Sequence, residues 1–188
     1  MRISSFISGV PGFRPGTGCL GLAVLLLALL LARGAVADTL PQPGDAVVLT
    51  VAGKISRSNG QDAAGRPEAR FDLAMLQHLG ITEFVTATPW HRGRVRFEGV
   101  LVRRLLEEVG ASGDRLYAVA HNEYTANIPR DDAVRYDMIL ALRANGHQLG
   151  LRDKGPVFIV YPYDTDAALR SDVMYSRSVW QLRRLEIQ

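Results

Sequence analysis

Two stretches of the chain repeat apolar residues at the spacing of a helix. Residues 101–109 and 71–79 each place their apolar side chains on one face and their polar side chains on the other. A glycine follows each stretch, Gly110 and Gly80, as is typical of a helix C-terminus. Asp72 can cap the first turn of the earlier stretch. The pattern predicts two short helices that pack on a core.

Runs of β-branched or alternating apolar residues predict strands. These runs are 47–51, 81–88, 95–100, 116–120, 124–128, 138–142, 157–161 and 178–187. Asn145-Gly146 is a strong hairpin signal, whereas the polar run 56–67 is expected to be a loop that turns at Asn59-Gly60.

The last run sets the expected orientation of the final strand. Its alternation puts Trp180 and Leu182, with Arg184 as a further candidate, on one side of the strand. On this pattern Trp180 is expected in the core, and a ligand platform is the alternative. Strands outnumber helices and do not alternate with them regularly, so we expect an α+β fold with a mixed sheet.

The start of the chain has the pattern of a secretory signal. Arg2 and Arg14 precede the apolar run Cys19 to Ala32, and Ala35-Val36-Ala37 offers small residues for cleavage before Asp38. The run is short for a membrane span, and an uncleaved anchor is the alternative. The arginines are isolated, so we expect the general secretory route and a periplasmic protein. Residues 1–37 would then be removed, and residues 38–188 would form one domain.

Loss of this leader changes both charge and cysteine content. It takes three arginines and no acid, so the 22 basic and 19 acidic residues of the whole chain become 19 of each. A chain whose acidic and basic residues balance lacks the excess positive charge that attracts nucleic acid. The one cysteine, Cys19, also lies in the leader, so no thiolate is left for a disulfide, a metal or nucleophilic catalysis.

No local motif of an enzyme or a metal site occurs in the remaining chain. Its four histidines lack the spacing of metal ligands, and no phosphate loop or nucleophile elbow is present. We therefore expect no metal and no catalytic residue. Polar and aromatic residues do gather in expected loops, where binding sites are usually built. The group consists of Trp90, His121-Asn122-Glu123-Tyr124, Arg152-Asp153-Lys154-Gly155, Tyr161, Tyr163, and Ser176-Arg177-Ser178. Such a set suits a planar heteroaromatic ligand, although the turn at 152–154 can equally be an ordinary solvated turn.

Several segments, in order, resemble the oxidoreductase molybdopterin-binding domain, the sulfite-oxidase fold. They are Phe97-Glu98-Gly99-Val100, Asn122-Glu123-Tyr124, Arg152-Asp153-Lys154-Gly155-Pro156, Tyr161-Pro162, and Ser176 to Leu182. The resemblance spans residues 47–187 and implies a mixed α+β fold whose loops 152–155 and 176–178 hold the polar end of a pterin. It also implies roles for single residues. Trp90 or Tyr124 would stack on the pterin, Asn122 and Asp153 would read its pyrimidine edge, and Arg152, Arg177 and Ser178 would hold its polar side chain.

One departure from the family bears directly on function. The catalytic members ligate molybdenum through a cysteine, and here the corresponding stretch 86–90 reads Thr-Ala-Thr-Pro-Trp. A hydroxyl is a poor substitute for a thiolate on a redox metal. The chain is also shorter than the family's enzymes. It is more similar to periplasmic pterin-binding regulators that act through a membrane receptor on cyclic di-GMP. The expectation is a non-catalytic binding protein for a reduced pterin without molybdenum. The alternatives are a molybdopterin-dependent oxidoreductase and an interaction module with an empty groove.

Overall fold

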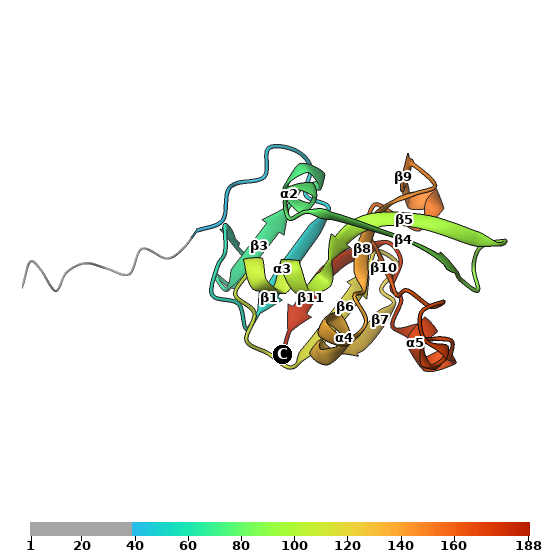
Figure 1. The fold of residues 1–188 in the computed structure, drawn as a ribbon. Helices are drawn as coiled ribbons and strands as arrows, with labels where there is room; N and C mark the ends of the chain where they lie inside the picture. Colours follow the sequence, from blue (N-terminus) through green and yellow to red (C-terminus); the bar gives the residue numbers. More distant parts are fainter. Residues whose placement is uncertain (1–38) are drawn as a thin grey trace, which may run out of the picture. The chain divides into compact units, whose positions relative to one another are not determined.

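A computed structural model describes residues 39–188. The expected leader and its cleavage site lie outside these residues. The described part contains two sheets, one of them mixed, and four short helices with two 3-10 turns, which confirms the α+β fold with a mixed sheet (Figure 1). In this part of the chain no helix is long and apolar enough to cross a membrane.

The first sheet has six strands in the order β2-β3-β1-β11-β6-β7. Its strands are β1 (Leu49–Gly53), β2 (Gly60–Gln61), β3 (Pro67–Phe71), β6 (Arg115–Ala120), β7 (Thr125–Pro129) and β11 (Leu182–Ile187). The pairing of β1 with β11 is parallel and the others are antiparallel, so this sheet is mixed. The early strand β1 thus lies beside the last strand of the chain.

The second sheet has the order β10-β8-β5-β4, and β9 extends β8 as a hairpin. Its strands are β4 (Ile81–Ala87), β5 (Arg94–Leu101), β8 (Ile139–Ala144), β9 (His147–Gln148) and β10 (Phe158–Val160). The hairpin turn is at Asn145-Gly146, as predicted, and both residues have positive φ. One cluster of buried apolar side chains draws on both sheets and forms the core.

Both predicted helices are present. They are α2 (Leu73–His78), capped by the side chain of Asp72, and α3 (Val102–Glu108), which buries Val102, Leu105 and Leu106. The sequence patterns did not reveal α4 (Arg130–Arg135), α5 (Asp172–Ser176), η1 (Leu151–Asp153) or η2 (Ala167–Leu169). These elements have at most six residues each, too few for a helical repeat of apolar positions to be seen.

Two local predictions were wrong. The turn expected at Asn59-Gly60 lies instead at residues 62–66, where the Asp62 N–H and the Arg66 carbonyl pair at 2.9 Å. This turn joins β2 to β3. In the last strand a register shift falls between Leu182 and Arg184, so alternation along the run is broken. As a result Leu182, Leu185 and Ile187 are buried, and Arg184 lies on the opposite face from them.

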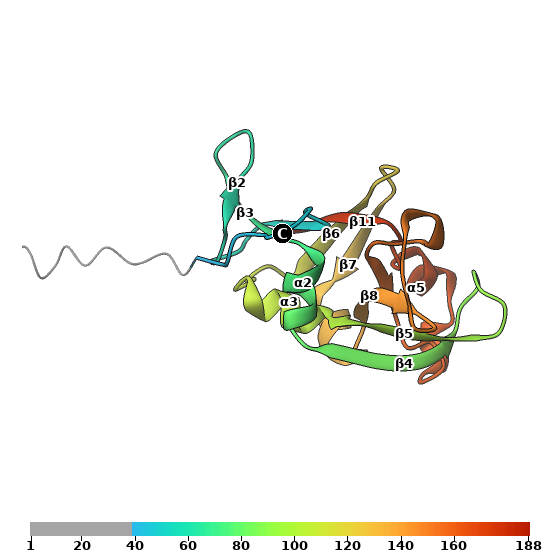
Figure 2. The same cartoon turned by 90° about the horizontal axis from the view of Figure 1, so that it is seen from above.

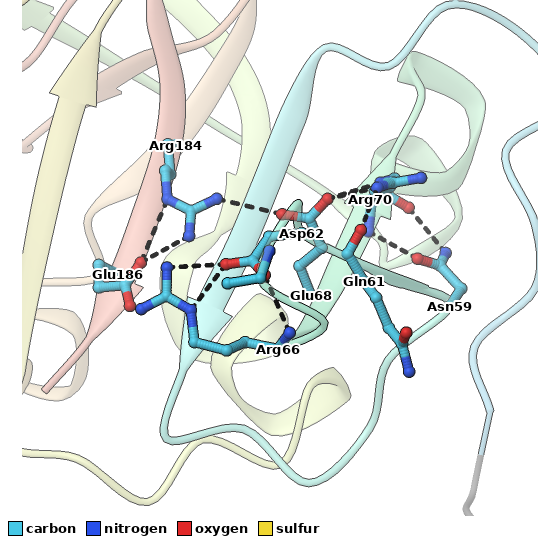
Figure 3. A network of polar contacts seen from close by, with 9 residues as sticks. Asn59, Gln61, Asp62, Arg66, Glu68, Arg70, Arg184 and Glu186 are labelled. Carbon is cyan, nitrogen blue, oxygen red and sulfur yellow. Dashed lines mark hydrogen bonds and ion pairs between the residues drawn. The ribbon is translucent and has the colours of Figure 1, made fainter.

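That opposite face of the six-stranded sheet carries a network of charged side chains (Figure 3). Arg184 bridges Glu68 of β3 at 3.2 Å and Glu186 of its own strand at 2.8 Å. Arg70 bridges Glu68 from the other side at 2.7 Å. Acids and bases balance within this network, so it forms a neutral, polar surface opposite the core.

Candidate functional site

A cavity of about 350 Å³ lies where three loop regions meet. Its lining comes from the β4–β5 loop, the β6–β7 turn, and the segment from α5 to the start of β11. The lining residues are Trp90, Asn122, Tyr124, Tyr175, Ser176, Ser178 and Trp180. The volume lies within the ~300–1,000 Å³ typical of small-molecule sites. Four of the seven predicted site residues, distant in sequence, therefore line one cavity.

Trp90 is the centre of an aromatic cluster in this wall. Its ring meets those of Trp180 and Tyr175 edge to face, with centroids 5.5 Å and 5.9 Å apart. Phe158 and Tyr163 pack against it from the core at 5.8 Å and 6.4 Å. Such edge-to-face contacts hold aromatic rings in defined orientations. Trp90 is half-buried, so part of a rigidly held ring remains available to the cavity.

The β6–β7 turn supplies the second wall. Glu123 adopts a positive φ of 65°, and the side chain of Asn122 accepts a hydrogen bond of 3.1 Å from the Tyr124 N–H. Asparagine favours such turns because its side chain can replace a backbone acceptor. The Tyr124 hydroxyl donates to the Ser176 carbonyl at 2.7 Å. This bond joins the turn to the end of α5 beside the cavity.

The third wall begins with α5, whose N-cap is Ser171. Ser178 follows the helix and is buried, and its hydroxyl donates to the Met174 carbonyl at 3.2 Å and contacts the Tyr163 hydroxyl. Burial raises the pKa of Tyr163, so its hydroxyl stays protonated and can donate to Ser178. Both hydrogen bonds fix the position of Ser178 next to the cavity.

Arg177 does not line the cavity. Its guanidinium donates at 2.9 Å to Asp132 of α4, a buried carboxylate that also accepts from the Tyr161 hydroxyl at 2.9 Å. Burial, and then the charge of Asp132, raise the pKa of Tyr161. Arg177 therefore anchors the segment that carries Ser176 and Ser178, and the ligand contact expected for it stays a prediction.

Arg152 and Asp153 are also absent from the cavity lining. Both are exposed on the short helix η1. The next residue, Lys154, places its ammonium 4.7 Å from the centre of the Trp180 ring, and its carbonyl accepts from the Gln181 N–H at 2.8 Å. The segment after η1 thus contacts Trp180 through Lys154, which brings a basic side chain beside a residue that lines the cavity.

The stretch that would hold a metal-ligating cysteine contains two buried threonines. Thr86 accepts a hydrogen bond from the Asp164 N–H at 3.1 Å, and Thr88 pairs with the His91 ring at 2.7 Å. Burial, and then the nearby Lys154, lower the pKa of His91, which favours its neutral form. Among residues 39–188 no three His, Cys, Asp or Glu side chains come together as a metal site would require.

The groups that line the cavity therefore fit the pterin of molybdopterin but not its molybdenum. Aromatic faces with nearby amide and hydroxyl groups fit a flat bicyclic pterin, which can stack and form hydrogen bonds along its edge. The site offers no thiolate, the soft ligand that molybdenum would need from the protein.

Sequence reasoning missed or undervalued three residues of this region. Trp180 was expected in the core; it packs against the core cluster and also lines the cavity. Gln181 beside it has a positive φ of 51°, which interrupts the alternation of an extended strand. Tyr175 lies in a helix too short to give a pattern. Asp132 was not singled out, and no pattern in its own segment marks its carboxylate as the buried partner of Arg177.

Comparison with known proteins agrees with the fold. The family described as "Oxidoreductase molybdopterin binding domain" matches residues 72–166. A crystal structure of the sulfane dehydrogenase SoxCD from Paracoccus pantotrophus is similar, with a TM-score of 0.53 and 20% sequence identity over 74% of this chain. This chain covers 37% of that one, so the similarity concerns a domain of a longer protein. No curated protein matches the chain.

The family match begins at the cap of α2, includes the first two walls of the cavity, and ends just after Tyr163 and Asp164. Together with the mixed six-stranded sheet and the antiparallel second sheet it accounts for the architecture that positions the site. The chain belongs to the oxidoreductase molybdopterin binding domain family.

Proposed function

We propose that this protein is a non-catalytic, periplasmic binding protein for a reduced pterin and regulates a membrane partner that controls cyclic di-GMP. The observation that carries the proposal is a family-typical fold whose cavity has aromatic walls and no thiolate. The pterin would stack on Trp90 or Trp180, and Asn122 and Ser178 would face its polar edge. The secretory signal expected from the sequence supports loading outside the cytoplasm, where a chain threaded out unfolded would acquire its ligand.

Ligand binding can be tested with the protein's own fluorescence. The chain has two tryptophans, and both line the cavity, so a ligand there should quench most of the tryptophan emission. We expect tetrahydropterin to bind, by equilibrium dialysis and by quenching, and Trp90→Phe to weaken binding. Tyr117→Phe is the matched control, because Tyr117 lies on the charged face of the six-stranded sheet and does not line the cavity. Failure of the wild-type protein to bind tetrahydropterin, combined with no pterin in extracts of the native protein, would refute the proposal.

The signalling role needs a separate measurement in the producing cells. We expect deletion of the gene to change the cellular level of cyclic di-GMP and the Trp90→Phe variant to reproduce that change in part. If the level of cyclic di-GMP did not change although the protein binds pterin, the result would refute the signalling role and leave the binding function supported.

A molybdopterin-dependent oxidoreductase is the second candidate, because the chain belongs to that domain family and shares its fold with a sulfane dehydrogenase. Fold similarity alone is weak support for an activity. Elemental analysis of protein purified from its native source decides between the two. Molybdenum at one atom per chain would favour the enzyme and displace the binding protein.

A further inference from the structure

Strand β4 is an open edge of its sheet. It has seven residues and pairs with β5 along its whole length without a register shift, and among residues 39–188 no strand pairs with its other side (Figure 2). Proteins usually protect such edges with proline, a bulge, lysine or a covering segment. β4 contains neither proline nor lysine.

The hydrogen bonds of β5 show which backbone groups of β4 are free. The Arg96 N–H donates to the Asn145 side chain at 3.0 Å, and the Arg96 carbonyl accepts from the Asn145 N–H at 2.8 Å. Both groups of Arg96 therefore point away from β4, so Val85, its partner in the register, is in a non-hydrogen-bonded pair. By alternation Ile81, Glu83 and Val85 point their N–H groups away from β5. Within residues 39–188 these three N–H groups have no partner.

One end of this edge is closed. The Ala87 N–H donates to Asp164 at 3.0 Å, and the Arg94 side chain donates to the Val85 carbonyl at 3.0 Å. Arg94 and Asp164 also form an ion pair of 3.0 Å. The open part of the edge therefore runs from Ile81 to the N–H of Val85.

A groove of about 490 Å³ follows the open part and carries excess negative charge. Thr82, Glu83 and Phe84 form one side, and residues 135–137 with the loop around Asp166 form the other. Its charged lining residues are the acids Glu83, Asp137 and Asp166 and the base Arg135. Asp137 is ion-paired with Arg103 of α3, so the excess negative charge of the groove rests on Glu83 and Asp166 against Arg135. On the face of β4 that carries Glu83, the side chains of Ile81 and Val85 are 51% and 46% exposed.

We propose that the β4 edge is a docking site for an extended segment of a partner protein, which adds a strand beside Ile81–Val85. The segment would carry lysine or arginine opposite Glu83 and apolar residues two positions to each side, opposite Ile81 and Val85. Backbone hydrogen bonds would supply affinity, and these alternate side chains would supply specificity. A second copy of this chain is a poorer occupant, because it would bring two acidic grooves together. The proposal is independent of ligand binding at the Trp90 cavity.

Amide hydrogen exchange, followed by NMR on residues 38–188, tests this site. In the free protein the Glu83 and Val85 amides should exchange much faster than those of Thr82 and Phe84, which bond to β5. The probe is the acetylated peptide Thr-Val-Thr-Lys-Thr-Val-Thr at up to about 1 mM, and its glutamate counterpart is the comparison. We expect the lysine peptide to slow exchange at Glu83 and Val85 and to bind roughly tenfold more tightly at low salt.

Two variants make the test specific. Glu83→Lys should invert the preference between the two peptides, whereas Glu107→Lys, an equal charge change on α3, should not. Val85→Pro removes one outward N–H without removing a bond to β5, and it should abolish the slowing. Slowing at Glu83 and Val85 with inversion by Glu83→Lys supports the proposal. No slowing with either peptide, slowing at the β7 edge instead, or slowing caused by raising the protein concentration alone would overturn it.

Discussion

Removal of the Asp132 carboxylate should destabilise the fold and loosen one wall of the cavity. Asp132 is 7% exposed and accepts hydrogen bonds from two side chains, Tyr161 and Arg177. In Asp132→Ala the fully buried Tyr161 hydroxyl loses its acceptor, at a cost of ~1–3 kcal/mol. The Arg177 side chain is 23% exposed and can reach water, so the ~3–5 kcal/mol typical of a broken buried pair must be discounted.

The unpaired Tyr161 hydroxyl and the lost Arg177 ion pair together predict a loss of about 3 kcal/mol in the free energy of unfolding for Asp132→Ala. For a domain of this size each kcal/mol lowers Tm by ~2–4 °C, so Tm should fall by roughly 6–12 °C. The assay is urea unfolding at pH 7, followed by circular dichroism. Asp131→Ala is the matched control, because Asp131 is the exposed neighbour on the same helix and should change stability by less than ~1 kcal/mol.

A double-mutant cycle separates the two partners of Asp132. Tyr161→Phe removes the hydroxyl that would be left unpaired, so combining it with Asp132→Ala should cost less than the sum of the single changes. If Asp132→Ala were no more destabilising than Asp131→Ala, the carboxylate would not hold this wall together and the argument would be wrong.

Three further changes test other parts of the structure. Hydrogen bonds from backbone N–H groups, that of Met75 foremost, lower the pKa of Asp72. The ionised Asp72 carboxylate therefore stabilises the fold above the pKa of an unfolded carboxyl group, and this stabilisation is lost as the pH falls through the pKa of Asp72 in the folded protein. Asp72→Asn should thus cost about 1 kcal/mol at pH 7 and far less at about pH 3 in urea titrations, and an equal cost at both would contradict this assignment. A Cβ on Gly99 would lie 2.0 Å from a backbone carbonyl oxygen of β8, so Gly99→Ala should lower the free energy of unfolding by more than ~3 kcal/mol. Thermal melts measure this loss, and an unchanged Tm would show that β5 can move away from β8 to accept the methyl group. Tyr124→Phe removes the hydrogen bond to the Ser176 carbonyl, and because Tyr124 is 42% exposed it should lower the free energy of unfolding by at most about 1 kcal/mol. Tetrahydropterin should be released faster in stopped-flow fluorescence, and an unchanged rate would exclude that bond as a restraint on the cavity.

Local patterns predicted those elements whose own residues repeat often enough to be recognised. The α3 helix and the hairpin at Asn145-Gly146 appear where the pattern put them, because apolar spacing and turn chemistry depend on neighbours in the chain. The resemblance of ordered segments was sufficient to identify the family, since that similarity extends over most of the described chain.

The membership of the cavity was only partly predictable. Trp90, Asn122, Tyr124 and Ser178 were proposed from their loops, and they line one cavity. Their roles as ligand contacts remain predictions. Arg177 lies next to Ser178 in the sequence, but the direction of its side chain depends on Asp132, 45 residues earlier. No pattern within either segment reports that contact.

The sequence by itself determined the composition of the site: aromatic rings, amides and hydroxyls in loops, with no cysteine after residue 19. These are properties of single residues, and folding does not change them. The tertiary structure decided which side chains face the cavity: Trp180 lines it, whereas Arg177 turns to Asp132, 45 residues earlier in the chain. It also decided that β4 is an edge, because a strand's neighbours are set by the packing of the whole chain.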